Sequence, residues 1–132
     1  MMTDAALDSF LHGRRVAVLA IPRPAKPPLT SPVWYEYDGS RFRIQVEAAS
    51  AKAKALDRRG PTPVSLTIQS EVPPYRYAVA YGTARFGAGG NAELRRRMAR
   101  RYFGRLAGDM YAAEEEKQGR HADQLRVIEI VP

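Results

Sequence analysis

The stretch that most restricts the fold runs from Val33 to Val46 and reads VWYEYDGSRFRIQV. Asp38–Gly39 is a strong signal for a tight turn between two antiparallel strands. Aromatic residues precede this turn, and after it Phe42, Ile44 and Val46 alternate with polar residues. A period of two places those three side chains on one face of a strand. The pattern therefore predicts a β-hairpin with one buried face, and with it an antiparallel sheet.

Four more segments are typical of strands because they are apolar or alternating and rich in β-branched residues. They are residues 15–21, 64–69, 75–86 and 125–131. With the two hairpin arms, 33–37 and 42–46, six strands are expected. We expect so many strands in one short domain of 132 residues to close into a barrel, which removes exposed sheet edges. Residues 22–28 hold four prolines and predict a loop.

Three helices are expected between the strands. The first, over residues 4–12, ends at Gly13, and the second runs to about Arg59 after the N-cap residue Ser50. The third covers residues 92–106, after a turn at 87–91 in which Asn91 is placed to cap the helix. Its apolar stripe recurs every four residues, as Leu94, Met98, Tyr102 and Leu106. The three glutamates at 114–116 are expected on a solvated helix face.

Composition excludes several kinds of site. The chain has no cysteine, so it holds no disulfide or thiolate metal site, and two histidines cannot build a metal centre alone. The longest apolar run, residues 16–21, is too short to cross a membrane, and the N-terminus lacks the basic region of a secretory signal. We therefore expect a soluble cytoplasmic protein. Its net charge of +7 favours an anionic partner: nucleic acid, membrane lipid or a phosphorylated small molecule.

No pattern identifies a catalytic side chain. No serine lies in a GxSxG turn, and His12 and His121 are expected to be solvated surface residues. The sequence has no P-loop and no dinucleotide fingerprint. The arginines of residues 92–106 permit two interpretations, a solvated basic face or a nucleic-acid contact surface. No helix-turn-helix pattern precedes them and no aromatic residues are interleaved, so nucleic acid is an unlikely partner.

The helix that follows Ser50 begins with cations. Lys52 and Lys54 lie in its first turn and a half, where the helix dipole disfavours positive charge. The free N–H groups of a helix N-terminus bind anions, so a phosphate there would interact with the lysines and the dipole together. The other interpretation is that both lysines simply point to solvent. The residues alone leave these alternatives open.

An ordered series of motifs resembles the pyridoxamine 5'-phosphate oxidase-like, FMN-binding split-barrel family, in particular its B-type flavin/deazaflavin oxidoreductases. In chain order the motifs are RVAVLAI, the Pro-Val-Trp of residues 32–34, KAKAL at 52–56, PYRY at 74–77, RYFG at 101–104 and RVIEIVP at 126–132. The resemblance covers roughly residues 7–132. It implies a mainly β fold with flanking helices, a six-stranded antiparallel split barrel spanning residues 1–132.

The resemblance also implies a ligand and a partner. The ligand would be FMN or coenzyme F-420, bound where two chains of a homodimer meet. Carried over by position, the phosphate site comprises Ser50, Lys52 and Lys54, and the segment along the ring comprises Ser31, Pro32, Val33 and Trp34. Tyr75 and Arg76 would open the strand that reaches the neighbouring subunit. Val46 stands where a threonine frequently contacts the cofactor.

The activity implied is an oxidoreductase that transfers hydride or electrons to an unidentified small molecule. The chemistry would belong to the cofactor, so no side chain is assigned as a general acid or base. Ile21, Val46 and Ala55 depart from the family pattern by replacing polar residues. They motivate the alternative of a non-catalytic split barrel that binds the cofactor itself, a tetrapyrrole or a lipid.

Overall fold

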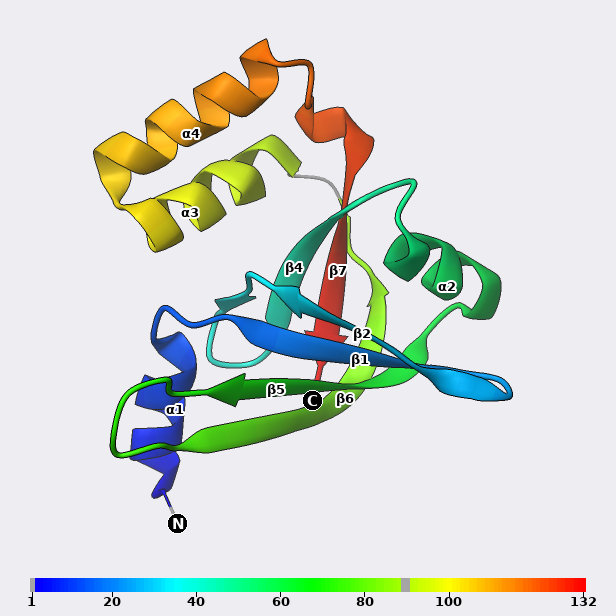
Figure 1. Cartoon of the computed structure of the whole chain (residues 1–132), viewed down its shortest axis with the longest axis vertical. Coiled ribbons are helices and arrows are strands. Elements are labelled where there is room, and N and C mark those ends of the chain that lie inside the picture. Colours follow the sequence, from blue (N-terminus) through cyan, green and yellow to red (C-terminus); the bar gives the residue numbers. More distant parts are fainter. Residues whose placement is uncertain (1, 89–90) are drawn as a thin grey trace.

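The computed structural model describes residues 2–88 and 91–132, which form one antiparallel sheet with helices around it (Figure 1). The sheet has seven strands in the order β2-β1-β5-β6-β7-β4-β3. The strands are β1 (Ala17–Arg23), β2 (Lys26–Val33), β3 (Glu36–Tyr37), β4 (Phe42–Glu47), β5 (Thr62–Gln69), β6 (Tyr77–Phe86) and β7 (Leu125–Val131). The helices are α1 (Asp4–His12), α2 (Ala51–Arg59), α3 (Asn91–Phe103), α4 (Arg105–Lys117) and the short η1 (Ala122–Gln124).

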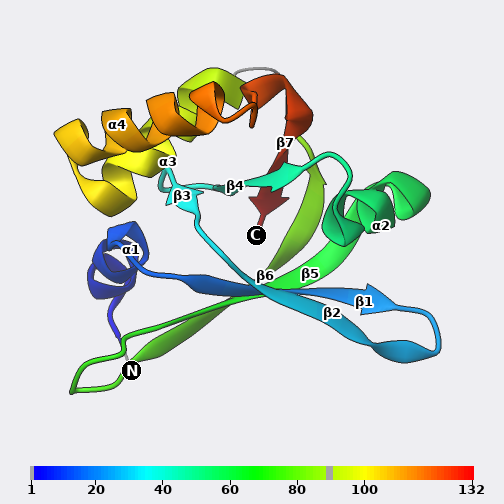
Figure 2. The same cartoon turned by 45° about the horizontal axis from the view of Figure 1, so that its top comes forward.

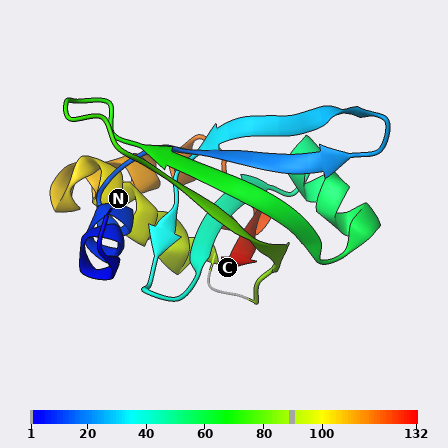
Figure 3. The same cartoon turned by 90° about the horizontal axis from the view of Figure 1, so that it is seen from below.

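The sheet is strongly curved, and the core lies inside the curve. β1, β2 and β5 form a layer beneath β4 and β7, and β6 continues from one layer to the other (Figure 2). Alternate residues of each strand point inward, as the period of two predicts for β4. Helices α1 and α2 lie near opposite ends of this open barrel (Figure 3). The inward residues include Leu19, Ile21, Phe42, Ile44, Leu66, Ile68, Ile128 and Ile130, joined by Phe10 and Leu11 of α1 and Leu56 of α2.

The prediction of a loop over residues 22–28 is wrong. β1 continues to Arg23 and β2 begins at Lys26, so the chain reverses within two residues. Proline cannot donate a hydrogen bond to a neighbouring strand, which is why it is excluded from central strands. β2 lies at the edge of the sheet, and Pro27 and Pro28 fall where its register with β1 shifts, so neither occupies a regular ladder position. Pro22 lies where the register between β1 and β2 shifts.

The predicted hairpin forms, but its first arm is divided. Only Glu36–Tyr37 pairs with β4, whereas the residues up to Val33 belong to β2 and pair with β1. Tyr35 lies between the two strands, and its hydrogen bonds go to groups outside the sheet instead of to a neighbouring strand. Its N–H donates to the Tyr102 hydroxyl at 3.0 Å, and its own hydroxyl donates to the Leu11 carbonyl at 2.8 Å. The division makes seven strands where six were expected.

The single helix expected over residues 92–106 is two antiparallel helices. Gly104 has φ +85°, a conformation that L side chains rarely adopt, and it separates α3 from α4 (Figure 1). The expected apolar stripe ends with the first helix, because Leu94 and Met98 are buried but Leu106 is 76% exposed. The second helix brings the glutamates of residues 114–116 back over the first.

Asn91 is the first residue of α3, and its side-chain amide donates to the Leu125 carbonyl at 2.9 Å. It therefore ties α3 to β7, which is not the capping role expected for it. The turn expected at residues 87–91 lies partly outside the described residues, since 89 and 90 are not among them.

Candidate functional site

The candidate site is a cleft of about 870 Å³ lined by residues of the α3–α4 hairpin, of the loop after β4 and of the end of β2. That volume lies toward the upper end of the range for small-molecule sites. The cleft is lined by Pro32, Val33, Trp34, Gln45, Val46, Glu47, Ala48, Ala49, Ser50, Lys52, Arg95, Met98, Tyr111, Glu115, Arg120, His121, Gln124 and Leu125. Six of the ten residues expected in the site are among them.

One end of the cleft is the N-terminus of α2. The Ser50 hydroxyl accepts the N–H of Ala53 at 3.2 Å, as expected for an N-cap. Helix geometry leaves the N–H groups of Ala51 and Lys52 without an intrahelical partner. The preceding loop is anchored by the N–H of Ala48, which donates to Gln124 at 2.9 Å. This end therefore offers backbone donors, the positive end of the helix dipole and one ammonium group.

The two lysines of α2 lie on different sides of the helix. Two residues along an α-helix correspond to a rotation of about 200°. Lys52 is half-buried and lines the cleft, whereas Lys54 is exposed and does not line it. The buried Ala53 and Ala55 fix this orientation because their side chains face the core. Only one of the two lysines is thus placed to meet a ligand in the cleft.

Trp34 and Tyr111 form an aromatic wall of the cleft, and other rings pack around Trp34. Trp34 stacks on Tyr102 with ring centroids 4.6 Å apart and planes 8° apart. Phe103 meets the edge of the indole at 5.2 Å, and Tyr111 of α4 lies 6.0 Å from it. The Tyr102 hydroxyl donates to the Arg15 carbonyl at 2.6 Å, which fixes the stack against the start of β1. Burial raises the pKa of the Tyr111 hydroxyl, which favours its uncharged form.

Paired charges line the third side of the cleft. Arg95, expected on a solvated face, is only 9% exposed; it binds Glu116 at 3.1 Å and donates to the Arg120 carbonyl. Arg120 pairs with Glu115 at 2.6 Å, and His121 Nδ1 lies 2.6 Å from Glu116. The hydrogen bond from His121 lowers the pKa of Glu116. These pairs hold α4 and η1 in place on the cleft's rim.

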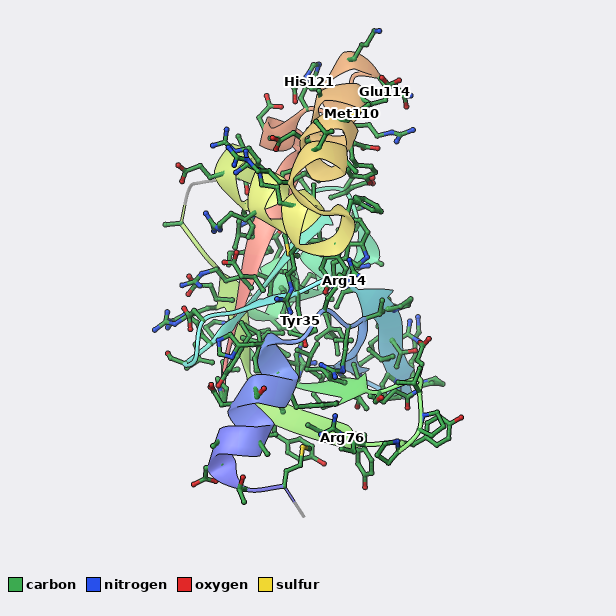
Figure 4. All side chains as sticks on the ribbon, turned by 90° about the vertical axis from the view of Figure 1, so that its left-hand side faces the viewer. Arg14, Tyr35, Arg76, Met110, Glu114 and His121 are labelled. Carbon is green, nitrogen blue, oxygen red and sulfur yellow. The ribbon has the colours of Figure 1, made fainter. Side chains whose placement is uncertain are left out.

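Three other expected residues lie outside the lining. Ser31 is next to Pro32 on β2, and its hydroxyl is buried without a hydrogen-bond partner among the described residues. Tyr75 and Arg76 line a separate hollow of about 380 Å³ at the turn between β5 and β6. Figure 4 places Arg76 near α1, far from His121 and Met110 at the other end of the molecule. These two residues do not meet the cleft within one chain.

Sequence reasoning missed the residues that α3, α4 and η1 contribute. Met98 belongs to the apolar stripe seen in the sequence, and that stripe predicts its burial. Nothing in the sequence predicts that Met98 lines a cleft. Tyr111 and His121 had no local signal, because only the reversal at Gly104 folds α4 back over β2 and β4. The alternation in β4 predicts that Gln45 lies on the polar face of that strand. Its side-chain amide donates to the Asn91 carbonyl at 2.7 Å.

Packing accounts for the three departures from the family pattern. Ile21 is fully buried, and Ala55 and Val46 are each 4% exposed. All three belong to the central core cluster. Val46 is the one of them that also lines the cleft, where it presents a methyl surface.

Most of the arginines that suggested nucleic-acid contact hold the helix to the rest of the chain. Arg97 donates to Glu36 at 2.7 Å, and Arg100 to Asp109 at 2.7 Å. Arg101 donates to the backbone carbonyls of His12 and Gly13 at 2.9 and 2.7 Å. Cations already committed to partners contribute less to phosphate binding, so the structure weakens the nucleic-acid interpretation.

Comparisons with known proteins agree with the architecture. The sequence pattern described as pyridoxamine 5'-phosphate oxidase matches residues 3–132. No curated protein gives a significant match to the chain. Within residues 2–88 and 91–132, no helix combines the length and apolar character needed to cross a bilayer.

Several solved structures share the fold. An F420 reductase is 20% identical with a TM-score of 0.73, covering 95% of this chain and 91% of that one. A conserved hypothetical protein from Mycobacterium tuberculosis is 23% identical with a TM-score of 0.74, covering 99% and 81%. A FAD-binding protein from Mesorhizobium loti is 13% identical with a TM-score of 0.67, covering 98% and 89%. Identities this low establish a common fold and nothing finer.

Proposed function

The chain belongs to the pyridoxamine 5'-phosphate oxidase family, and on that premise we propose that it is an oxidoreductase that binds FMN or coenzyme F-420. Residues 1–132 would form one split-barrel domain. The observation that carries the proposal is that two parts of the cleft differ in their chemistry. An anion-binding helix N-terminus lies at one end and an aromatic wall at the other, as a molecule with a phosphate and a flat ring system requires.

The residues present fit such a cofactor. Ser50 and Lys52 would hold the phosphate, with the free N–H groups of the first turn of α2. Val33 and Trp34 would lie along the ring, and the partnerless hydroxyl of Ser31 is a hydrogen-bonding group next to that segment. The cofactor would supply the hydride or electron transfer. The protein would bind it, orient its ring and exclude water from its buried face.

The solved relatives support this ligand class without choosing within it. One is titled an F420 reductase and another a FAD-binding protein. Both ligands carry phosphate and a flat tricyclic ring. The proposal therefore covers FMN and F-420 alike, and the substrate is a small molecule that approaches the ring.

A homodimer is part of the proposal. The outer face of the curved sheet exposes apolar side chains, with Val18 44%, Tyr77 69% and Tyr81 75% exposed. Val18 is on β1 and the two tyrosines are on β6, and both strands pair with β5, so the three side chains lie on one surface. A second copy would remove this surface from water at roughly 25 cal/mol per Å² of apolar area. Tyr75 and Arg76, at the end of β6, would then meet the partner chain.

The test is a fluorescence titration with FMN and with F-420. The wild-type chain is expected to bind one of them with a Kd below about 100 μM, which corresponds to roughly 5.5 kcal/mol. Lys52→Ala should weaken binding by about 1.5–3 kcal/mol, because it removes a charged hydrogen bond to the phosphate. Lys54→Ala is the matched control from the same helix, and its affinity should stay within about twofold of wild type.

The outcomes separate the alternatives. Binding of neither cofactor would refute the oxidoreductase proposal. Equal effects of the two lysine substitutions would refute the phosphate assignment to the cleft. Tight binding without oxidation or reduction of added acceptors would favour the non-catalytic carrier.

A further inference from the structure

Three charged side chains form a connected series of contacts on the rim of the cleft. Arg95 of α3 donates to one carboxylate oxygen of Glu116 at 3.1 Å, and Nδ1 of His121 lies 2.6 Å from the other oxygen. Arg95 is only 9% exposed, so the packing of α3 holds its guanidinium, which in turn holds the carboxylate. A carboxylate on one ring nitrogen fixes the orientation and the tautomer of an imidazole. His121 is therefore oriented through contacts that begin in the protein interior.

The second nitrogen of the His121 ring is available to a ligand. Within residues 2–88 and 91–132, the hydrogen bond of this ring is made by Nδ1 and not by Nε2. Half of the side chain is exposed, and His121 lines the cleft whereas Glu116 does not. The two nitrogens of an imidazole point away from each other, so the bond to Glu116 leaves Nε2 on the far edge of the ring.

The net charge of this rim depends on the protonation of His121. Arg95 pairs with Glu116. Arg120 pairs with Glu115 at 2.6 Å, so the cations and the carboxylates of the two pairs balance. An imidazolium at His121 adds a charge of +1 to a cluster that is otherwise neutral. The hydrogen bond from His121 lowers the pKa of Glu116, which favours the ionised carboxylate beside the ring. The other charged residues that line the cleft or are close to His121 in the chain are Glu47, Lys52 and Asp123.

An aromatic ring adjoins the same rim. Tyr111 and His121 both line the cleft. Burial and then the charge of Glu115 raise the pKa of the Tyr111 hydroxyl, whereas Arg120 lowers it, so this ring lies within electrostatic reach of the rim. A titratable cation beside a flat apolar surface suits a small molecule that combines an aromatic ring with a carboxylate.

We propose that His121 contacts the substrate of the proposed reaction, and that its imidazolium donates from Nε2 to the carboxylate of a small aromatic acid bound in the cleft. Glu116 is the positioning residue, because it acts on the ligand only through the ring of His121. The assignment rests on the proposed function for its purpose, since a substrate must share the cleft with the cofactor. The contact itself can be tested without any cofactor.

The chain has only two histidines, which makes the contact measurable by nuclear magnetic resonance of their rings. His12 is the internal control: its Nδ1 lies 2.8 Å from the Asp8 carbonyl, its side chain is 44% exposed, and it is not part of the cleft lining. The probe is benzoate, with benzamide as the uncharged control ligand. We expect benzoate to shift the ring signals of His121 saturably and to leave those of His12 in place. Benzamide should bind more weakly.

The affinity for benzoate should fall as the pH rises from about 5 to about 8, the range in which histidine ordinarily loses its charge. His121→Gln remains polar and similar in size but does not titrate. Its affinity at the low end of this range should be roughly threefold to tenfold weaker than wild type, a charged hydrogen bond reduced for solvent exposure. The affinity of this variant should also change little with pH. His12→Gln is the matched control and should behave as wild type.

Glu116→Gln tests the positioning role. The variant removes the negative charge next to Nδ1 and keeps an oxygen that can accept its proton. The pH at which benzoate affinity is halfway between its two limits should become lower, because the imidazolium loses the carboxylate that stabilises it. A purely structural role of Glu116 would leave that pH unchanged and would contradict the assignment.

Two further results would overturn the proposal. They are a failure of benzoate to shift the His121 signals, and wild-type affinity with wild-type pH dependence in His121→Gln, which would place the anion at the N-terminus of α2. Titrating His121→Gln with FMN and F-420 separates substrate from cofactor: cofactor affinity should stay within about twofold of wild type. A larger loss would assign His121 to the cofactor instead. Absence of cofactor binding in wild type would refute the proposed function and leave the benzoate contact standing.

Discussion

Lys52 and Lys54 show that the neighbours of a residue determine the direction in which its side chain points. In the sequence the two are equivalent, each an alanine-flanked lysine in the first turns of one helix. The core contacts of Ala53 and Ala55 turn Lys52 to the cleft and Lys54 to solvent. Local chemistry predicted the helix and its Ser50 cap, both of which are confirmed. The direction of each side chain depended on which face of α2 the sheet buries.

Asp38 permits a prediction at the same scale. Its carboxylate accepts the N–H groups of Ser40 and Arg41, each at 2.9 Å, and a bond from Arg43 at 2.8 Å. The backbone bond from Arg41 leads the causes that lower the pKa of Asp38 from 3.8 to about 2. A lowered pKa in the folded state stabilises the fold above pH 3.8, and this contribution disappears as the pH falls through about 2.

Asp38→Asn keeps the acceptor but removes the charge. At neutral pH the variant should be less stable than wild type by about 1 kcal/mol, a value reduced for solvent screening. The difference should shrink as the pH falls from about 4 to about 2. Urea denaturation at a series of pH values measures both free energies of unfolding. A difference that does not change with pH would contradict the assigned pKa.

At the scale of elements, the α3–α4 hairpin forms one wall of the cleft. Two glycines allow its two helices to reverse direction and pack closely. Gly104 supplies the positive φ at which the chain reverses. Gly108 supplies close approach, because a Cβ there would lie 2.6 Å from the backbone of Ala99. The sequence predicted one helix here because glycine within a helical pattern is tolerated at a modest cost. Only the packing of α4 on α3 reveals that Gly104 ends a helix.

Gly108→Ala should force α4 away from α3. The added methyl group meets backbone atoms, which cannot rotate aside, so we expect a loss of about 1–3 kcal/mol in the free energy of unfolding. Because Tyr111 and Glu115 follow on the same helix, ligands of the cleft should also bind more weakly. Ala107→Ser, at the exposed neighbouring position, is the control and should change stability by less than about 0.5 kcal/mol. Equal stability of both variants would refute the close contact.

At the scale of the whole molecule, the curved sheet has two kinds of surface. Its inner face forms the core, and its outer face carries Val18, Tyr77 and Tyr81 in water. Large exposed apolar patches mark interaction sites in ordinary soluble proteins. The outer face is more than one strand wide, and it is the surface proposed for the homodimer.

Tyr81→Asp together with Val18→Asp should therefore give a monomer. Charges on a buried apolar interface remain unpaired and cost more than the contact contributes. Analytical ultracentrifugation of wild type and variant measures the change, and Val72→Asp is a control at an exposed position on the β5–β6 turn. A wild type that sediments as a monomer would contradict the proposed dimer. Weaker cofactor binding by the monomeric variant would indicate that the partner chain completes the site.

The sequence by itself determined the features whose physics is local. Alternation fixed the inward faces of β4 and β5, glycine and serine fixed the ends of α1 and α2, and the Asp38–Gly39 turn fixed the hairpin. These depend on hydrogen bonds and side-chain periods within a few residues. The order of motifs along the chain also identified the family.

Only the tertiary structure decided which distant residues meet. Trp34 and Tyr111 lie 77 positions apart (111 − 34) yet share one cleft wall, with ring centroids 6.0 Å apart. Pro27 and Pro28 became part of the edge strand β2, which has a neighbour on one side only. Arg95 became buried because α4 folded back with Glu116 beside it. Each outcome depends on the free energy of packing between elements that are distant in the chain. A short stretch of sequence does not contain both packing partners, so it cannot predict the outcome.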